Sequence, residues 1–180
     1  MEQNTFLLEI QKSKNVEVKK CYQCGKCSAG CPLANDMDYP PSMIMRMIQT
    51  ENKALEKKIL ESKTIWLCLS CEMCYGRCPM EIDIPTVMDF LRSKSIKENL
   101  VNKEMKDVVK FHEAFLKSIE TSGRLNEFGL VLDYKMKTGH LMQDVATAPS
   151  MFAKGKLHFF PEGVKDKKNI KNIFKKTLKK

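Results

Sequence analysis

All eight cysteines of this 180-residue chain lie in two copies of one spacing, Cys-x2-Cys-x2-Cys-x3-Cys-Pro. The first copy, CYQCGKCSAGCP, spans residues 21–32, and the second, CLSCEMCYGRCP, spans residues 68–79. Three cysteines at positions i, i+3 and i+6 can direct three thiolates inward from one short loop, as three corners of an iron–sulfur cubane require. The fourth cysteine begins a departing segment, and in two-cluster ferredoxins with this spacing it ligates the other cluster.

The repeat therefore predicts two [4Fe–4S] clusters with crossed ligation. The expected ligands of cluster 1 are three cysteines of the first copy and the last cysteine of the second: Cys21, Cys24, Cys27 and Cys78. The expected ligands of cluster 2 are the remaining four: Cys68, Cys71, Cys74 and Cys31. Small residues in the loops let backbone N–H groups approach the cluster sulfides, and such hydrogen bonds raise the reduction potential: Gly25, Ser28, Ala29, Gly30 and Gly76.

Two other uses of cysteine fit the pattern less well. A structural zinc site needs four ligands, usually from two separated Cys-x2-Cys knuckles. Each copy here instead places four thiols within eleven residues and ends in proline. Disulfides are typical of small secreted domains, and a chain of this length can bury a core without them. Iron–sulfur clusters are the stronger interpretation.

No second catalytic or cofactor-binding pattern accompanies the cysteines. His112, His140 and His158 are isolated from one another and from both motifs, and we interpret them as surface or helix residues. Neither a G-x-G-x-x-G nor a P-loop motif is present, so no flavin, nicotinamide or nucleotide site is expected. Eight thiolates saturate two cubanes, and a cubane with four cysteine ligands has no open position for a substrate. We therefore expect an electron carrier that is not catalytic by itself.

The residues after each motif predict helices. One helix is expected to begin near Ser42, and another is expected to be capped by Asp83 with Pro85 in its first turn. Apolar residues of the first helix share one face, which we interpret as core packing: Met43, Ile44, Met47 and Ile48. Apolar residues of the second follow the i, i+3, i+4, i+7 pattern: Ile84, Val87, Met88 and Leu91.

Three more helices are expected further along the chain. The first includes Met105 to Ile119 and is stopped by Gly123, the second ends at Gly139, and the third covers HLMQDVATA and ends at Pro149. No segment alternates polar and apolar residues as a strand would. The fold class we predict is mostly α, a helical ferredoxin with additional C-terminal helices, and not the β-rich body of the small bacterial ferredoxins.

The predicted organisation has three parts. Residues 1–100 form a helical ferredoxin dicluster domain, residues 101–160 form a helical extension that docks a partner, and residues 161–180 form a basic tail. Residues 154–180 hold ten lysines against two acidic residues, so most of the net charge of +9 lies there. The tail has no arginine and one aromatic residue, Phe174, which gives base stacking little support. We expect a solvated or docking helix and no nucleic-acid partner.

Composition also bears on the compartment. No run of 18 apolar residues occurs, so no membrane span is expected. The first twenty residues, MEQNTFLLEIQKSKNVEVKK, place acidic and polar residues where a signal peptide needs an apolar stretch. A cytoplasmic protein is the expectation.

The two motifs, the helical spacer and the chain length resemble those of the C subunit of heterodisulfide reductase. The resemblance covers about residues 15–100 and includes all eight cysteines one by one. It implies a helical ferredoxin fold with two [4Fe–4S] clusters. It also implies two partners. A flavin-containing iron–sulfur protein, the A subunit, would donate electrons, and a cysteine-rich catalytic protein, the B subunit, would cleave the disulfide of coenzyme M and coenzyme B. Related complexes use similar subunits on other thiols or disulfides.

Two other interpretations stay open. Iron–sulfur subunits of succinate dehydrogenase, fumarate reductase and glycolate-oxidase-type enzymes carry the same dicluster, but they add a [2Fe–2S] domain or further cysteine-rich repeats that are not found here. In a different class, the clusters could stabilise a scaffold or a nucleic-acid-binding module that uses the basic tail.

Overall fold

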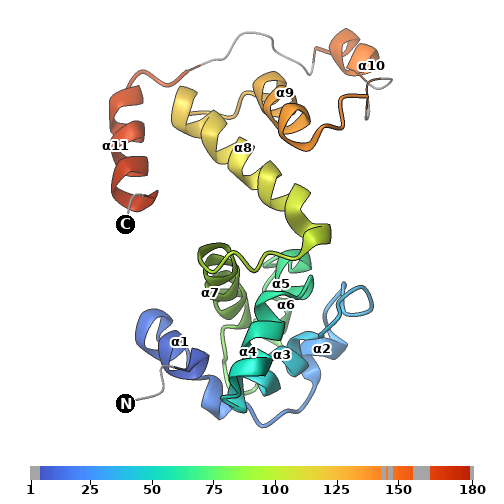
Figure 1. The fold of residues 1–180 in the computed structure, drawn as a ribbon, viewed down its shortest axis with the longest axis vertical. Coiled ribbons are helices and arrows are strands. Elements are labelled where there is room, and N and C mark those ends of the chain that lie inside the picture. Colours follow the sequence, from blue (N-terminus) through green and yellow to red (C-terminus); the bar gives the residue numbers. More distant parts are fainter. Residues whose placement is uncertain (1–4, 143–144, 146–147, 156–162, 179–180) are drawn as a thin grey trace. The chain divides into compact units, whose positions relative to one another are not determined.

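The computed structural model describes residues 5–142, 145, 148–155 and 163–178 (Figure 1). The chain divides into an N-terminal unit, Met1–Met105, and a C-terminal unit, Lys106–Lys180. Helices account for the regular structure of the described residues, and no β-strand occurs among them. The mostly α fold with additional C-terminal helices is therefore confirmed. None of the described helices is long and apolar enough to cross a membrane.

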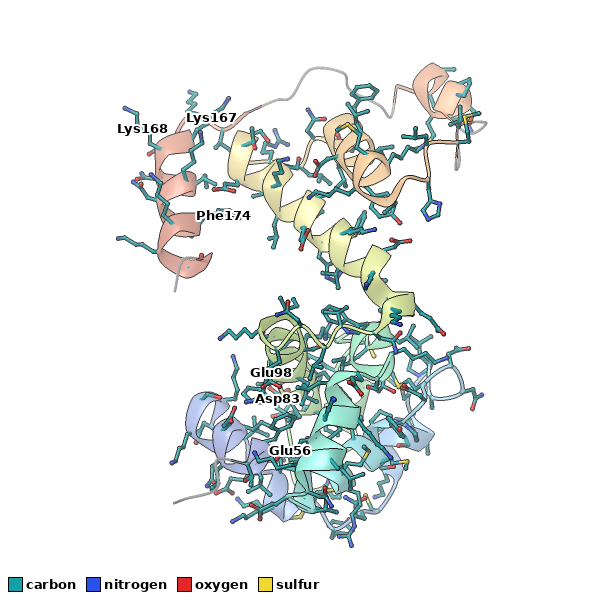
Figure 2. The ribbon with its side chains drawn as sticks, in the orientation of Figure 1. Glu56, Asp83, Glu98, Lys167, Lys168 and Phe174 are labelled. Carbon is teal, nitrogen blue, oxygen red and sulfur yellow. The ribbon has the colours of Figure 1, made fainter. Side chains whose placement is uncertain are left out.

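The N-terminal unit begins with α1 (Phe6–Lys14) and the 3-10 turn η1 (Val18–Lys20). Helix α1 packs against α3 (Pro41–Gln49) and α7 (Ile84–Lys97). The first turn of α1 is held by Glu56, which is buried and labelled in Figure 2, because its Oε1 accepts a hydrogen bond from the Phe6 N–H at 2.8 Å. This carboxylate supplies a cap that Thr5 does not provide with its own side chain.

Helices α3, α4 (Lys53–Leu60), α5 (Thr64–Leu67) and α7 form the core of this unit. The predicted helix near Ser42 is α3, but its predicted face is partly wrong. Met43 is 46% exposed, and the buried residues at i, i+3, i+4 and i+7 are Pro41, Ile44, Met45 and Ile48, with Met47 beside them. Packing against α1 and α4 decides which face of α3 is buried, so the buried stripe is centred on Ile44 and Met45 and leaves Met43 outside it.

Helix α7 agrees with its sequence signals. The carboxylate of Asp83 accepts a hydrogen bond from the Thr86 N–H at 2.9 Å, and Pro85 lies in the first turn. The predicted apolar face is buried against α1, α4, α5 and α6 (Met73–Gly76): Ile84, Val87, Met88 and Leu91. The capped start of α7 thus begins six residues after the last cysteine of the second motif.

The C-terminal unit contains α8 (Lys106–Ser122), α9 (Glu127–Thr138), α10 (Ala148–Ala153) and α11 (Lys167–Leu178), and the turn η2 (Lys103–Met105) precedes it. Helix α8 packs against both α9 and α11. It ends before Gly123 and α9 ends before Gly139, as predicted, and both glycines have positive φ, 78° and 80°. In Figure 2 the lysines Lys167 and Lys168 project from the first turn of α11.

The helix predicted over residues 140–148 is wrong for its first three residues, although Val145 and Ala148 are helical. His140, Leu141 and Met142 follow α9 without helical structure, and residues 143–144 and 146–147 lie outside the described residues. Helix α10 begins at Ala148, so Pro149 stands in a first turn instead of ending a helix. A proline there costs no intrahelical hydrogen bond, since the first N–H groups of a helix have no partner within it.

Candidate metal centre

The two cysteine motifs have the same backbone shape, displaced by 47 residues. A short helix carries the third cysteine of each copy, α2 (Lys26–Ala29) in the first and α6 in the second. The third and fifth residues of both loops have positive φ. These are Gln23 (62°) and Gly25 (76°) in the first copy, and Ser70 (50°) and Glu72 (61°) in the second.

In both loops the two left-handed residues flank the second cysteine of the motif. Residues that alternate between right-handed and left-handed conformations form concave nests of N–H groups, a geometry found at many Fe–S sites. Gly25 adopts its conformation at no steric cost, whereas Glu72 does so with a Cβ atom present. The second loop thus keeps the same shape although its sequence does not favour it, which points to a shared role.

Two cavities lie beside these loops. One is lined by Gln23, Gly25 and Lys26 of the first loop, by Ser42 and Met45 of α3, and by Ile82 and Ile84 near the start of α7; its cysteines are Cys21, Cys24, Cys27 and Cys78. The other is lined with Met37, Met88 and Pro85, and its cysteines are Cys31, Cys68, Cys71 and Cys74. The structure therefore brings together the two sets of four thiols named from the sequence, with the last cysteine of each motif at the cavity of the other. That each set ligates a cluster stays a prediction.

The two cavities adjoin each other. Ile84 lines both of them, and helices α2 and α6, which carry Cys27 and Cys74, pack against one another. Two redox groups held here would share Ile84 as a lining residue. Short separation is what electron transfer between them needs.

The donor set fits a four-iron cluster. Among the described residues, no three His, Cys, Asp or Glu side chains stand close enough to hold one metal ion. A single zinc ion draws its thiolates to about 2.3 Å, whereas a cubane takes each thiolate on a different iron atom and so needs a wider frame. Four thiols spread around an apolar cavity match that second requirement.

Burial shapes the acidity of the thiols. Burial raises the pKa of Cys27, and burial together with the charge of Cys68 raises the pKa of Cys74 to about 11. Both side chains are therefore neutral near pH 7 in the metal-free chain. Because iron binds thiolate, cluster binding must release these protons.

Two nitrogen donors reach cysteine sulfur. The Nε2 of Gln23 lies 3.3 Å from the Sγ of Cys21, and the backbone N of Ile82 lies 3.4 Å from the Sγ of Cys78. Both sulfurs belong to the first set of four. The sequence prediction included small residues as backbone donors but missed Gln23, because a side-chain donor to sulfur has no sequence signature of its own.

The aromatic residues near the motifs do not line the cavities. Tyr22 and Tyr75 are 59% and 43% exposed, Trp66 is buried, and none of the three lines either cavity. Methionine and isoleucine side chains line the cavities instead. The histidines are also apart from the loops: His112 and His140 belong to the exposed surface of the C-terminal unit, and His158 lies outside the described residues.

Part of the chain is similar to a known domain family. Residues 17–82, which include both loops and both cavities' cysteines, match a family described as a 4Fe-4S dicluster domain. This similarity to the 4Fe-4S dicluster domain is confined to residues 17–82 of the 180-residue chain.

Relatives among characterised proteins narrow this further. The chain is 35% identical over 91 residues to the C subunit of the ferredoxin:CoB-CoM heterodisulfide reductase of Methanosarcina acetivorans. It is 29% identical over 102 residues to the iron-sulfur C subunit of the CoB–CoM heterodisulfide reductase of Methanopyrus kandleri. It is 27% identical over 106 residues to the C subunit of the H(2):CoB-CoM heterodisulfide,ferredoxin reductase of Methanothermobacter marburgensis. These matches cover 51%, 57% and 59% of this chain and span 35%, 52% and 56% of the relatives' own lengths. The chain is a relative of the heterodisulfide reductase C subunits.

Proposed function

We propose that this chain relays electrons through two [4Fe–4S] clusters within a heterodisulfide-reductase-type complex. A flavin-containing iron–sulfur protein, the A subunit, would donate to one cluster. The other cluster would pass electrons to a cysteine-rich protein, the B subunit, that acts on a disulfide or thiol. The observation that carries the proposal is the pair of adjoining cavities, each lined by four cysteines. The names of the relatives support the kind of complex.

In this role the cysteines would hold the two redox groups, and the apolar side chains around them would exclude water. When bound, each cluster supplies a one-electron redox couple. Cys21, Cys24, Cys27 and Cys78 would hold cluster 1, and Cys31, Cys68, Cys71 and Cys74 would hold cluster 2. Met45, Ile82 and Ile84 exclude water from the first cavity, and Met37 and Met88 exclude it from the second. With every thiolate engaged, the chain itself would offer no position for a substrate.

Exposed apolar side chains support docking to partner chains. Next to the cysteines of the second loop, Leu69 is 68% exposed and Met73 is 45% exposed, and Tyr22 stands beside the first two cysteines of the first loop. Such residues are unusual at a surface that faces only water. We propose that the loops face the partner subunits, since electron transfer requires a short path from each cluster to the next centre.

The C-terminal unit would add a second docking element. In α9, Leu132 and Met136 lie one turn apart and are 49% and 62% exposed. The helical extension over residues 101–160 is accordingly proposed to bind a partner, with the basic tail over residues 161–180 as a salt-sensitive clamp.

Reconstitution tests the proposal directly. Anaerobically prepared chain should hold roughly eight iron and eight sulfide, and copurification should recover a flavin protein and a cysteine-rich protein. Disulfide reduction from a flavin-linked donor should then require this chain. Turnover that does not change when the chain is omitted would refute the relay role, and stoichiometric zinc without iron would refute the clusters. A shift of DNA mobility on adding the chain would instead favour the nucleic-acid module.

A further inference from the structure

The first cysteine of each motif is held by a side chain from the long helix nearest to it. Gln49, at the end of α3, donates from Nε2 to the carbonyl oxygen of Cys21 at 2.7 Å. Arg92 of α7 approaches the carbonyl oxygen of Cys68 with Nη1 at 3.4 Å, which is long for a hydrogen bond. Both contacts reach back from a helix that begins after the motif.

Each of these side chains also binds the third residue of its motif. Gln49 Oε1 accepts a hydrogen bond from Gln23 Nε2 at 3.1 Å, and Arg92 Nη2 donates to Ser70 Oγ at 2.9 Å. Gln23 and Ser70 occupy the same place in the repeat, and both have positive φ. The two halves thus share one arrangement of contacts but differ in charge, with a neutral amide pair in the first and a guanidinium in the second.

The amide orientation in the first half follows from its hydrogen bonds. Gln49 Nε2 donates to the carbonyl oxygens of Val18 and Cys21, so Oε1 is the atom left to face Gln23. Gln23 must therefore present its NH2 group there, since Oε1 only accepts. The Nε2 of Gln23 also lies 3.3 Å from Cys21 Sγ, so this sulfur faces an N–H donor and not a carbonyl oxygen.

Arg92 brings a positive charge to the second half. Its side chain is 17% exposed, and its ion-pair partner Asp89, 3.0 Å away, is 63% exposed and so is largely screened by water. The Nε–H of Arg92 is buried and has no partner among the described residues. A guanidinium is always charged, and this one lies against the loop of Cys68 and Ser70.

We propose that Gln23, oriented by Gln49, and Arg92 are positioning residues that each raise the reduction potential of one cluster. Reduction adds a negative charge to a cluster. An N–H donor at a ligating sulfur and a nearby cation both stabilise the reduced form more than the oxidised form. Gln23 acts on the cluster of Cys21, and Arg92 acts on the cluster of Cys68. This inference rests on the proposed function, because it requires the two clusters.

A redox titration followed by EPR on the anaerobically prepared full chain tests the proposal. Gln23→Met removes the donor while keeping the length of the side chain, and Arg92→Gln removes the charge. Each substitution should lower one midpoint potential, and the two should lower different ones. Each substitution should lower the equilibrium constant for reduction of its cluster about tenfold. For a one-electron couple this lowers the midpoint potential by about 59 mV. Arg92→Lys should retain most of the wild-type potential, because it keeps the charge.

Controls distinguish a change in midpoint potential from a change in folding or in cluster content. Lys97→Gln removes an exposed positive charge from the same helix and should move neither midpoint. Iron and sulfide contents are measured for every variant. If the wild-type chain holds no [4Fe–4S] cluster, the proposed function fails. If the clusters are intact and both substitutions move the same midpoint, or neither moves one, the proposed function stands and this inference is wrong.

Discussion

Asp38 caps the helix that leads into the second cysteine motif, through hydrogen bonds to Thr64. The N–H of Thr64 donates to Oδ1 at 3.0 Å and its hydroxyl donates to the same atom, while the N–H of Lys63 donates to Oδ2 at 3.0 Å. Burial raises the pKa of Asp38, but the hydrogen bonds from Thr64, Lys63 and Tyr39 outweigh it, so the pKa lies below its usual value. The segment after the first motif is in this way tied to the start of α5.

Replacing Asp38 should therefore weaken both motifs together. Asp38→Ala removes a cap, and losses of this kind cost about 1 kcal/mol. Asp38→Asn keeps an acceptor at Oδ1 and should lose less. The midpoint of thermal unfolding of the cluster-loaded chain, measured anaerobically, compares the three proteins. An Asp38→Ala midpoint equal to that of the wild type would show that the cap contributes nothing.

The left-handed residues of the loops give a second prediction. Glu72 holds a Cβ atom at a φ of 61°, where an L residue is strained by about 1–2 kcal/mol. Glu72→Gly should raise the free energy of unfolding by roughly 0.5–1 kcal/mol, since the relief of strain exceeds the extra entropy that glycine gives the unfolded chain.

Gly25 provides the matched control for this change. Its φ is 76°, and an added Cβ would meet no atom within 4 Å, so Gly25→Ala introduces strain without a clash. It should lower stability by a similar amount. Denaturant titrations of both variants measure the two effects. Changes of the same sign would contradict the shared left-handed geometry.

The acidity of Cys74 gives a third prediction. Only a thiolate is alkylated, and a pKa of about 11 leaves Cys74 largely neutral where an ordinary thiol, with a pKa near 8.5, has lost its proton. The alkylation rate of Cys74 in metal-free chain should still rise about tenfold per pH unit between pH 9 and 10. The rate at an ordinary thiol in a short reference peptide should level off there.

Peptide mass spectrometry after timed alkylation gives the rate at each cysteine. Restricted access to a cysteine lowers its alkylation rate at every pH, whereas a raised pKa changes how steeply that rate depends on pH. The dependence of the rate on pH therefore distinguishes the two causes. Parallel profiles for Cys74 and the reference peptide thiol would show that the pKa of Cys74 is not raised.

Sequence reasoning succeeded where the cause was local. Asp83 and Pro85 specify the start of α7 within a few residues, and Gly123 and Gly139 follow their helices in the left-handed conformation. Sequence reasoning was wrong for residues 140–142 and for the role of Pro149, because a proline that ends a helix and a proline that begins one give the same local signal.

The features that the sequence did not predict depend on tertiary packing. Gln49 and Arg92 contact cysteines 28 and 24 residues away, and no periodicity in the sequence marks either side chain. Spacing predicted that Met43 lies in the core, but the packing of α3 against α1 and α4 buries Met45 and leaves Met43 exposed. The two sets of cysteines could be predicted because the repeated spacing is a local pattern in the sequence. The residues that surround each set could not be predicted, because they depend on how α3 and α7 pack.

The crossed arrangement of the last cysteines gives the final prediction. Cys78 lines the cavity of Cys21, Cys24 and Cys27, and the Ile82 N–H lies 3.4 Å from its sulfur. Cys31 lines the other cavity with Cys68, Cys71 and Cys74. Cys78→Ser should therefore damage cluster 1, and Cys31→Ser should damage cluster 2, each variant keeping roughly four of eight irons in the undamaged cluster.

Comparison within and between the motifs gives this test its control. Cys78→Ser should reproduce the EPR spectrum of Cys24→Ser, which removes a ligand of the same expected set, and should differ from that of Cys71→Ser. Cys31→Ser should match Cys71→Ser instead. Selenocysteine at position 78 or 31, followed by pulsed EPR, identifies the cluster bound at each position. If position 31 couples to the cluster of Cys21, ligation runs within each motif, and the crossed assignment is wrong for both clusters.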